Sequence, residues 1–277
     1  MLKIDAHQHF WKFDSVNHSW ITEDMAVIRR DFMPQDLEPV LKRNGMDGCV
    51  LVQVDQTPEE NLFQLKNARE HDFIKGVVGW VDLRSVDIEE QLQELRGHDL
   101  LKGFRHILQG EDDRALMLRP EFLNGVGKLR HYGFTYDILI FPDQLVYAAE
   151  FAGRFPDLPM VLDHIAKPDI RGGEAGDWEQ GLRELAKREN VYCKVSGMVT
   201  EARWRHWKHE DFVPYLDVVF DAFGTDRVMF GSDWPVCLVS AGYEALKEIT
   251  DEYISGFSGY ERELFMGGNA VKFYNLK

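Results

Sequence analysis

Short apolar runs alternate with amphipathic helical segments eight times along this chain. Almost continuous apolar runs of about four to eight residues are typical of parallel strands that are covered on both faces. The runs that we expect to form strands are Ile4–His9, Cys49–Val54, Lys75–Val81, Leu101–Arg105, Phe134–Ile140, Met160–His164, Val191–Ser196 and Arg227–Gly231. Eight strand–helix units in 277 residues predict an α/β protein, a (β/α)8 barrel that forms one domain over residues 1–277.

The segments between these runs carry helix signals. Thr57, Pro58, Glu59 and Glu60 read as an N-cap, a proline at the first helical position and acids in the first turn. Further helices are expected near residues 34–44, 88–95, 120–131, 143–154, 178–189 and 212–223. An open doubly wound sheet is the rival architecture. The dinucleotide-binding form of that fold needs a Gly-x-Gly-x-x-Gly motif after the first strand, and this chain has none there.

The charge balance narrows the classes of partner. A formal net charge of −15 disfavours nucleic acid and anionic membranes, because both attract basic surfaces. No apolar run approaches the roughly 20 residues of a membrane span. The amino end shows no signal-peptide pattern, and the three cysteines are far apart without a Cys-x-x-Cys motif. These features predict a cytoplasmic protein with reduced thiols.

Polar side chains stand where several of the expected strands end, and in a parallel barrel those ends form the face that holds active sites. His7 and His9 project from one face of the first strand, because residues i and i+2 point to the same side. Such a pair suits a metal ion or an attacking water. Residues two apart in a regular strand are about 6.6 Å apart, so a shared metal needs the strand end to curl. The other candidates are Gln53, Arg105, Tyr136, His164 and Asp233.

Three of these candidates also have a purely structural interpretation. Asp233 fits the N-cap of a following helix. His164 fits a core histidine with satisfied hydrogen bonds, and Arg105 fits a surface ion pair, which is the commoner fate of arginine. We favour function for Asp233, because an acid directly after an apolar strand needs a reason to be there.

Alternation along a strand lets only one of two neighbouring side chains face the barrel interior. We therefore expect Arg105 rather than His106 to face inward, and His164 rather than Asp163. The sequence leaves open the roles of Lys167, Asp137, Trp204 and Trp207. The two tryptophans fit either a lid or an amphipathic helix packed on the barrel.

Taken together, six motifs resemble the amidohydrolase superfamily, and more narrowly its sugar-lactonase branch. The motifs are His7–Trp11, Gly76–Leu83, Gly103–His106, Leu162–Pro168, Gly231–Pro235 and Gly268–Ala270. The combined pattern is specific, although each piece alone is not. The resemblance implies a distorted (β/α)8 barrel with hydrolytic chemistry, and it carries the family's site onto His7, His9, His164 and Asp233.

The sequence departs from the metal-rich members of that superfamily at two strands. Those members place a lysine or glutamate on strand four and a histidine on strand five, where this chain has Arg105 and Tyr136. A bridged two-metal centre is therefore not expected. The resemblance implies one divalent ion, with zinc as the first choice, or no required metal.

The leading hypothesis is hydrolysis of a sugar-derived lactone, such as L-fucono- or L-rhamnonolactone, to the open hydroxy acid. Asp233 would act as general base toward water, and Arg105 would stabilise the developing oxyanion or hold substrate oxygens. The histidines His7, His9 and His164 would either ligate one ion or bind the lactone and water directly.

Four residues are candidates for contact with the small-molecule substrate: Trp11, Gln53, Trp80 and Tyr136. A core role fits the tryptophans equally well. The alternative reaction is metal-dependent decarboxylation of an aromatic or unsaturated carboxylic acid on the same barrel. A non-catalytic sugar-acid binder is a third hypothesis, which the complete residue set disfavours. The oligomeric state is left open, with a homodimer allowed.

Overall fold

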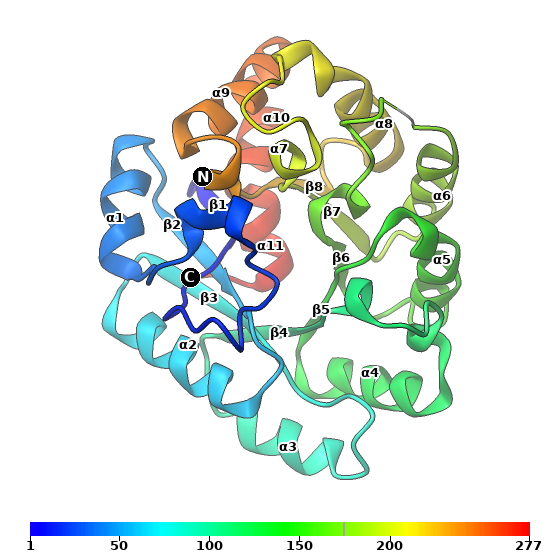
Figure 1. The fold of residues 1–277 in the computed structure, drawn as a ribbon. Coiled ribbons are helices and arrows are strands. Elements are labelled where there is room, and N and C mark those ends of the chain that lie inside the picture. The colour runs from blue at the N-terminus through cyan, green and yellow to red at the C-terminus, as the bar shows by residue number, and fades with distance from the viewer. Residues whose placement is uncertain (174) are drawn as a thin grey trace.

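Eight parallel strands form the barrel in the computed structural model, counted over the described residues 1–173 and 175–277 (Figure 1). The strands are β1 (Ile4–Gln8), β2 (Gly48–Val52), β3 (Ile74–Gly79), β4 (Leu101–His106), β5 (Thr135–Ile138), β6 (Met160–Leu162), β7 (Val191–Val195) and β8 (Val228–Phe230). They pair in sequence order from β1 to β8. The predicted (β/α)8 barrel is confirmed.

The barrel closes where β1 meets the segment that follows β8. The backbone N–H of Asp233 donates to the carbonyl oxygen of His7 at 2.8 Å, and the N–H of His9 donates to that of Trp234 at 2.7 Å. These bonds continue the ladder beyond the end of β8. As a result, the predicted site residues of the first and last strands are neighbours although they are more than 220 positions apart.

Most of the helices surround the strands on the outside (Figure 1). The helices are α1 (Pro34–Arg43), α2 (Pro58–Glu70), α3 (Ile88–Leu95), α4 (Pro120–Tyr132), α5 (Leu145–Gly153), α6 (Gly176–Ala186), α7 (Met198–Glu201), α8 (Val213–Phe223), α9 (Tyr243–Tyr253), α10 (Gly259–Glu263) and α11 (Asn269–Tyr274). The predicted cap is confirmed at α2, where the Thr57 hydroxyl accepts the N–H of Glu60 at 3.3 Å. α4 ends at Gly133, whose φ of +82° is a left-handed conformation that glycine adopts without steric cost.

Strand β5 is shorter than the apolar run Phe134–Ile140 predicts. Its pairing with β6 ends at Ile138. The carbonyl oxygen of Leu139 instead accepts the N–H of Gln109 at 3.0 Å, which ties the chain to the loop after β4. A long-range contact therefore takes the place of strand pairing, and the sequence pattern does not reveal it.

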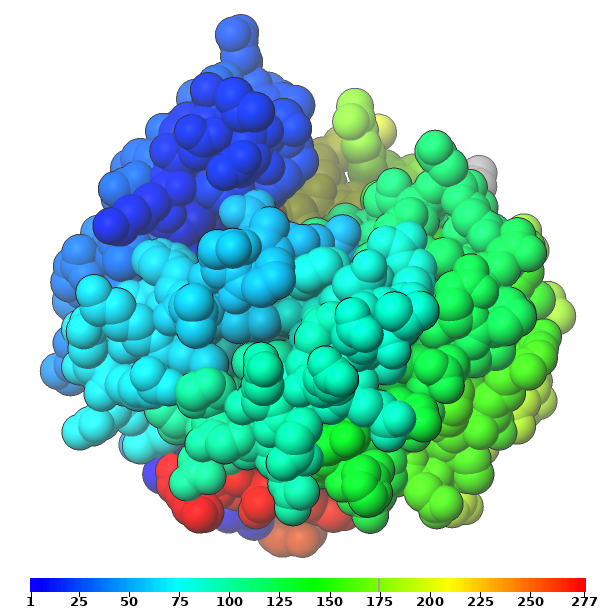
Figure 2. Space-filling view, turned by 90° about the horizontal axis from the view of Figure 1, so that it is seen from below, coloured from blue at the N-terminus to red at the C-terminus, as the bar shows by residue number. Residues whose placement is uncertain are grey.

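The interior of the barrel is apolar at its amino end. Side chains from several strands form a cluster there with the C-terminal helix α11: Ile4, Ala6, Val50, Val52, Val78, Val161, Met229, Ala270, Phe273 and Tyr274. In Figure 2 the C-terminal segment lies at one end of the molecule, opposite the N-terminal lobe. α11 thus closes the amino end, and access to the interior is left to the carboxyl end of the strands.

The segment after β1 forms a lobe on the carboxyl-end rim (Figure 2). Trp11 and Phe32 pair through two backbone hydrogen bonds of 2.9 and 3.0 Å, so the segment returns to its own start. The Trp11 indole donates to the carbonyl oxygen of Arg30 at 2.9 Å. This lobe forms one wall of the cavity described below. No helix among the described residues has both the length and the apolar character needed to cross a bilayer.

Candidate active site

A cavity of about 300 Å³ opens at the carboxyl end of the barrel. Its walls include His9, Trp11, Arg105, His164, Lys167 and Asp233. A larger cavity of about 560 Å³ lies beside α7 and contains none of the predicted site residues. The chemistry of the walls therefore favours the smaller cavity as the active site, because most of the predicted reactive groups meet there.

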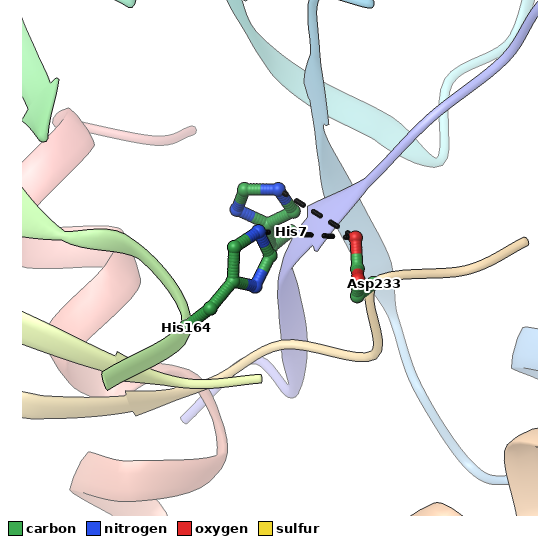
Figure 3. A group of neighbouring side chains, drawn as sticks. All are labelled: His7, His164 and Asp233. Atoms are coloured by element: carbon green, nitrogen blue, oxygen red, sulfur yellow. Dashed lines mark ion pairs between the residues drawn. The ribbon is translucent and has the colours of Figure 1, made fainter. Parts of the chain in front are cut away.

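Three imidazole nitrogens converge on one carboxylate oxygen. Figure 3 shows two of these rings, His7 and His164, beside Asp233. Oδ1 of Asp233 lies 3.3 Å from Nε2 of His9, 3.9 Å from Nε2 of His164 and 4.0 Å from Nε2 of His7. The Nε2 atoms of His7 and His9 are 3.2 Å apart, so the end of β1 brings the two rings together. A register shift between Asp5 and Gln8 accompanies this approach. Ligand atoms of His7, His164 and Asp233 all lie within 4.8 Å of one another, a spacing that suits a metal ion.

Hydrogen bonds on the far side of each ring orient these histidines. Nδ1 of His9 donates to the carbonyl oxygen of Val52 at 2.8 Å, and Nδ1 of His164 lies 2.9 Å from the Ser196 hydroxyl. A carbonyl oxygen can only accept, so a neutral His9 carries its lone pair on Nε2, facing Asp233. Two acceptors facing each other need a cation or a proton between them. Partners of this kind are what fix metal-binding histidines in other proteins.

Burial keeps two of the rings uncharged. His7 is fully buried and His164 is nearly so, and burial lowers the pKa of each imidazole well below its usual value. The positive charges around them act in the same direction. At neutral pH these rings are therefore available to accept a hydrogen bond or to bind a cation, which a protonated imidazole cannot do.

Arg105 reaches across the barrel and uses all five of its N–H groups inside the protein. Nε and Nη2 both donate to Oε1 of Gln53, at 3.3 and 2.9 Å, and Nη2 also donates to the Gln53 carbonyl oxygen at 2.5 Å. Nη1 donates to Oδ2 of Asp163 at 3.0 Å and faces Nε2 of His7 at 3.2 Å. Because arginine can only donate, Nε2 of His7 accepts in this contact. On the other side of the ring, Nδ1 of His7 lies 3.2 Å from Oδ1 of Asp163 and 3.2 Å from Nζ of Lys194.

A buried ionic network lies beneath these groups. Nζ of Lys194 is 2.6 Å from Oδ2 of Asp137 and 3.0 Å from Oδ1 of Asp163, and all three side chains are buried. Tyr274 of α11 donates to Oδ2 of Asp137 at 2.7 Å. Burial raises the pKa of Asp137 to about 6. At Asp163 burial acts in the same direction, but the charges of Lys194, His7 and Arg105 outweigh it and hold the pKa well below the usual value.

The structure places the predicted substrate-binding residues in different environments. Trp11 lines the cavity, whereas Gln53 holds Arg105. The prediction that Tyr136 binds substrate is at odds with its position: its ring packs against Phe122 of α4 and Phe151 of α5, on the outer face of the barrel. Alternation along β5 turns Asp137 inward instead. Trp80 also lies outside the cavity, where its indole faces Nδ1 of His106 at 3.4 Å.

The two choices between neighbouring residues had different outcomes. Arg105 faces the interior as expected, while His106 pairs with Glu111 in a loop at 2.6 Å. His164 reaches the site as expected, but the expectation that Asp163 faces away was wrong, because both side chains point into the site. Strict alternation ends at Leu162, after which His164 adopts a φ of 54° and the chain turns. Asp163 then supports His7 and Arg105, and His164 reaches the cavity.

The structure also shows where the residues lie whose roles the sequence left open. Lys167 lines the cavity and Asp137 lies beneath it. Trp207 donates to the Ser240 hydroxyl at 3.0 Å, and Trp204 lines the larger cavity beside α7. Neither tryptophan lines the active-site cavity, which disfavours a lid. The predicted amphipathic helix is also absent from this part of the described chain, because α7 ends at Glu201 and both tryptophans pack against the core from a non-helical segment.

Sequence reasoning missed Lys194 and Ser196. The sequence did contain a pattern that could have identified Lys194. A lysine inside the short apolar strand Val191–Val195 needs a buried partner for its charge when both faces of the strand are covered. No such pattern distinguishes Ser196 from any other polar residue at a strand end. Its contact with His164 depends on how two neighbouring strands end.

The chain is similar to known proteins over nearly its whole length. Residues 4–276 match the family model described as amidohydrolase. An L-fucono-1,5-lactonase of Burkholderia multivorans is 38% identical over 286 residues, covering 99% of this chain and 96% of that protein. A crystal structure of an amidohydrolase from Burkholderia multivorans with bound zinc is 38% identical, with a TM-score of 0.95 and full coverage of both chains.

A more distant likeness extends to decarboxylases. The structure of a dihydroxybenzoic acid decarboxylase from Polaromonas sp. JS666, with bound manganese and an inhibitor, is 14% identical with a TM-score of 0.68. It covers 99% of this chain and 97% of that chain. At this identity the likeness concerns the fold alone.

Proposed function

The chain belongs to the amidohydrolase family, and from this membership and the geometry of its site we propose that it hydrolyses a sugar-derived lactone to the open hydroxy acid. The observation that carries the proposal is the convergence of three imidazoles on the Asp233 carboxylate within a small cavity. The similarity to an L-fucono-1,5-lactonase over nearly the whole of both chains supports a six-membered aldonolactone as the substrate class.

Asp233 is the proposed general base. Its side chain reaches the cavity and is fixed by the backbone bond from its own N–H to His7. The carboxylate removes a proton from water while the water oxygen forms a bond to the lactone carbonyl carbon. The bond from that carbon to the ring oxygen then breaks, the electron pair stays on the ring oxygen, and the proton returns to it. Water and substrate held in this geometry offset the modest basicity of a carboxylate.

His9 and His164 position the water and the lactone. Nε2 of His9 is the imidazole nitrogen nearest to Asp233, at 3.3 Å, so a water bound to that carboxylate oxygen also meets His9. The neutral ring of His164, whose Nδ1 faces Ser196, presents Nε2 to the same space. The tryptophan wall at Trp11 supplies an apolar surface against which a sugar ring can lie.

The donor set also fits one divalent ion. Imidazole nitrogens and a carboxylate are ligands that zinc accepts, and each ring has a partner that orients it. We propose His7, His164 and Asp233 as the ligands, with His9 beside them. When bound, such an ion would polarise the carbonyl and acidify a bound water. Because an Arg105 N–H already faces Nε2 of His7, we propose that hydrolysis does not require the ion.

A panel of lactones tests the proposal. Acid release at pH 7 is followed for L-fucono-, L-rhamnono-, L-galactono- and D-sugar lactones, on the chelated protein and after zinc addition, with metal analysis of each sample. Hydrolysis of the lactones of one stereochemical series supports the proposal. If hydrolysis persists after chelation, the reaction does not require a metal ion. Absence of turnover on every lactone with and without zinc would refute it and leave the decarboxylase alternative to be tested.

A further inference from the structure

The side chain that stabilises the oxyanion of lactone hydrolysis needs an N–H group that is not already bonded elsewhere. Attack on a lactone carbonyl moves negative charge onto the carbonyl oxygen, and a donor aimed at that oxygen is a large contribution to catalysis. Sequence reasoning gave this role to Arg105. In the structure, all five N–H groups of Arg105 are already directed at Gln53, Asp163 and His7. Its charge faces the cavity, but its hydrogen-bond donors do not.

Lys167 is a second cation in the wall of the same cavity. Its Nζ forms neither an ion pair nor a hydrogen bond with any residue that the structure describes. The ammonium lies 5.7 Å from the centre of the Phe141 ring, and it lowers the pKa of Glu201, which burial raises, without closing to an ion pair. Three N–H donors on a flexible stem are therefore free to turn toward a ligand.

A strained turn puts this lysine in place. His164, Ile165, Ala166 and Lys167 have φ values of 54, 49, 59 and 51°, four successive non-glycine residues in the left-handed region. Each residue there is disfavoured by contact of Cβ with the backbone, and runs of such residues are rare. The Lys167 N–H donates to the His164 carbonyl oxygen at 2.8 Å and closes the turn. Strain that the surrounding structure maintains is a mark of function.

The turn has a specific geometric result. In a tight helical turn of about three residues, side chains at i and i+3 project to the same side. His164 and Lys167 thus both line the cavity, while Ile165 and Ala166 between them are fully buried in the hydrophobic core. The Trp178 indole donates to the Ile165 carbonyl oxygen at 2.7 Å and anchors the turn from behind. In an ordinary extended segment, residues three apart project to opposite faces.

We propose that Lys167 is the catalytic residue that binds the lactone carbonyl oxygen and stabilises the oxyanion, and that Arg105 is a positioning residue for His7. As the water oxygen bonds to the carbonyl carbon, the carbonyl π electrons move to the oxygen, which the Lys167 ammonium contacts. When the carbonyl re-forms, the ring C–O bond breaks and the ring oxygen takes the proton that Asp233 had accepted. Lys167 keeps its own protons throughout. This inference rests on the proposed lactone hydrolysis.

Three variants test it: Lys167→Ala, Lys167→Arg and, as a matched control, Lys66→Ala at an exposed position on α2. Steady-state kinetics on the best lactone are combined with thermal unfolding and metal analysis of each variant. We expect Lys167→Ala to lose about 10²–10³ in kcat, as for loss of one oxyanion donor, with KM changed much less. Lys167→Arg should keep more activity than Lys167→Ala, and Lys66→Ala should match the wild type.

Chemical rescue separates a catalytic cation from a structural one. Ethylammonium added to Lys167→Ala should raise kcat in a saturable manner, with no effect on Lys66→Ala. If the kcat of Lys167→Ala stays within about threefold of the wild-type value, the inference is overturned while lactone hydrolysis stands. The inference is also overturned if folded Lys167→Ala loses much of its kcat, ethylammonium does not restore it, and Lys167→Arg is no more active than Lys167→Ala. A wild-type protein that opens no lactone would overturn both.

Discussion

Lys194 and Asp137 form an ion pair of 2.6 Å inside the barrel, where neither side chain is exposed. Lys194 also lies 3.0 Å from Asp163, so one cation serves two buried carboxylates. Taking charges out of water is costly, and the cost is offset only while each charge keeps its partner. The network thus holds Asp163, and through it His7, in a defined position under the cavity.

We expect Lys194→Met to lower the free energy of unfolding by about 3–5 kcal/mol, because it leaves two buried carboxylates without their cation. Urea denaturation at pH 7 measures the change. The matched control is Lys187→Met, which removes an exposed pair with Glu184 on α6 and should stay within about 0.5 kcal/mol. A Lys194→Met protein as stable as the control would show that the network contributes no net stability.

Asp5 makes stability depend on pH. It is fully buried, and burial raises its pKa from 3.8 to about 6. The folded protein therefore holds this proton more tightly than the unfolded chain. The unfolding free energy supplied by Asp5 is complete below pH 4 and is lost as pH rises through about 6. A difference of about two pKa units corresponds to about 3 kcal/mol.

Asp5→Asn cannot titrate and should lack this component, while its amide oxygen can still accept the Ser232 N–H that Asp5 accepts at 2.8 Å. We expect the wild type to lose about 3 kcal/mol more than Asp5→Asn between pH 4 and pH 8 in urea denaturation. Asp137 titrates in both proteins, so its part cancels in the comparison. Parallel pH profiles for the two proteins would contradict the assignment.

Arg105→Lys should not behave as a conservative change. A lysine ammonium cannot hold Gln53, Asp163 and His7 together, because it lacks the planar five-donor geometry of the guanidinium. We expect kcat/KM for the lactone to fall about 10²-fold, as for a displacement of about 1 Å of a positioned group. Arg154→Lys, at an exposed position directly after α5, is the control and should leave kcat/KM unchanged. Equal activity of the two variants would rule out a positioning role.

Ser196→Ala removes the partner of His164 without changing the cavity wall itself. Loss of the bond to Nδ1 frees the ring to rotate, and such outer partners are worth about 10–100-fold in activity or metal affinity. We expect kcat/KM to fall by about tenfold while thermal stability changes little. Ser15→Ala, at an exposed position of the lobe after β1, provides the baseline. If both variants retain full activity, His164 does not depend on this bond.

The sequence carries the fold and the outline of the site, since both follow from local patterns. Apolar runs and caps such as Thr57 mark strands and helices, and strand ends place His9 and Asp233 on one face of the barrel. Contacts between distant residues are beyond such patterns. The bonds of Arg105 to Gln53 span 52 positions, and the indole bond that anchors Ile165 depends on where α6 packs.

The turn from His164 to Lys167 shows a further limit. Residue preferences argue against four left-handed residues in succession, so no propensity could predict them. Alternation, applied one residue too far, gave the wrong result at Asp163. At Tyr136 alternation holds, but the sequence alone did not show which of Tyr136 and Asp137 faces inward. The departure from local rules in the turn from His164 to Lys167 is adjacent to the site, as expected where the structure serves function rather than local preference.

The role of Asp233 is tested most directly by replacing it with asparagine, which keeps its size and removes its basicity. Asp72→Asn, at an exposed position after α2, is the matched control. With the best lactone at pH 7, we expect Asp233→Asn to lose about 10²–10⁴ in kcat, the usual contribution of a general base, while Asp72→Asn remains at the wild-type value. A folded Asp233→Asn protein that opens the lactone at the wild-type rate would show that this carboxylate is not the base.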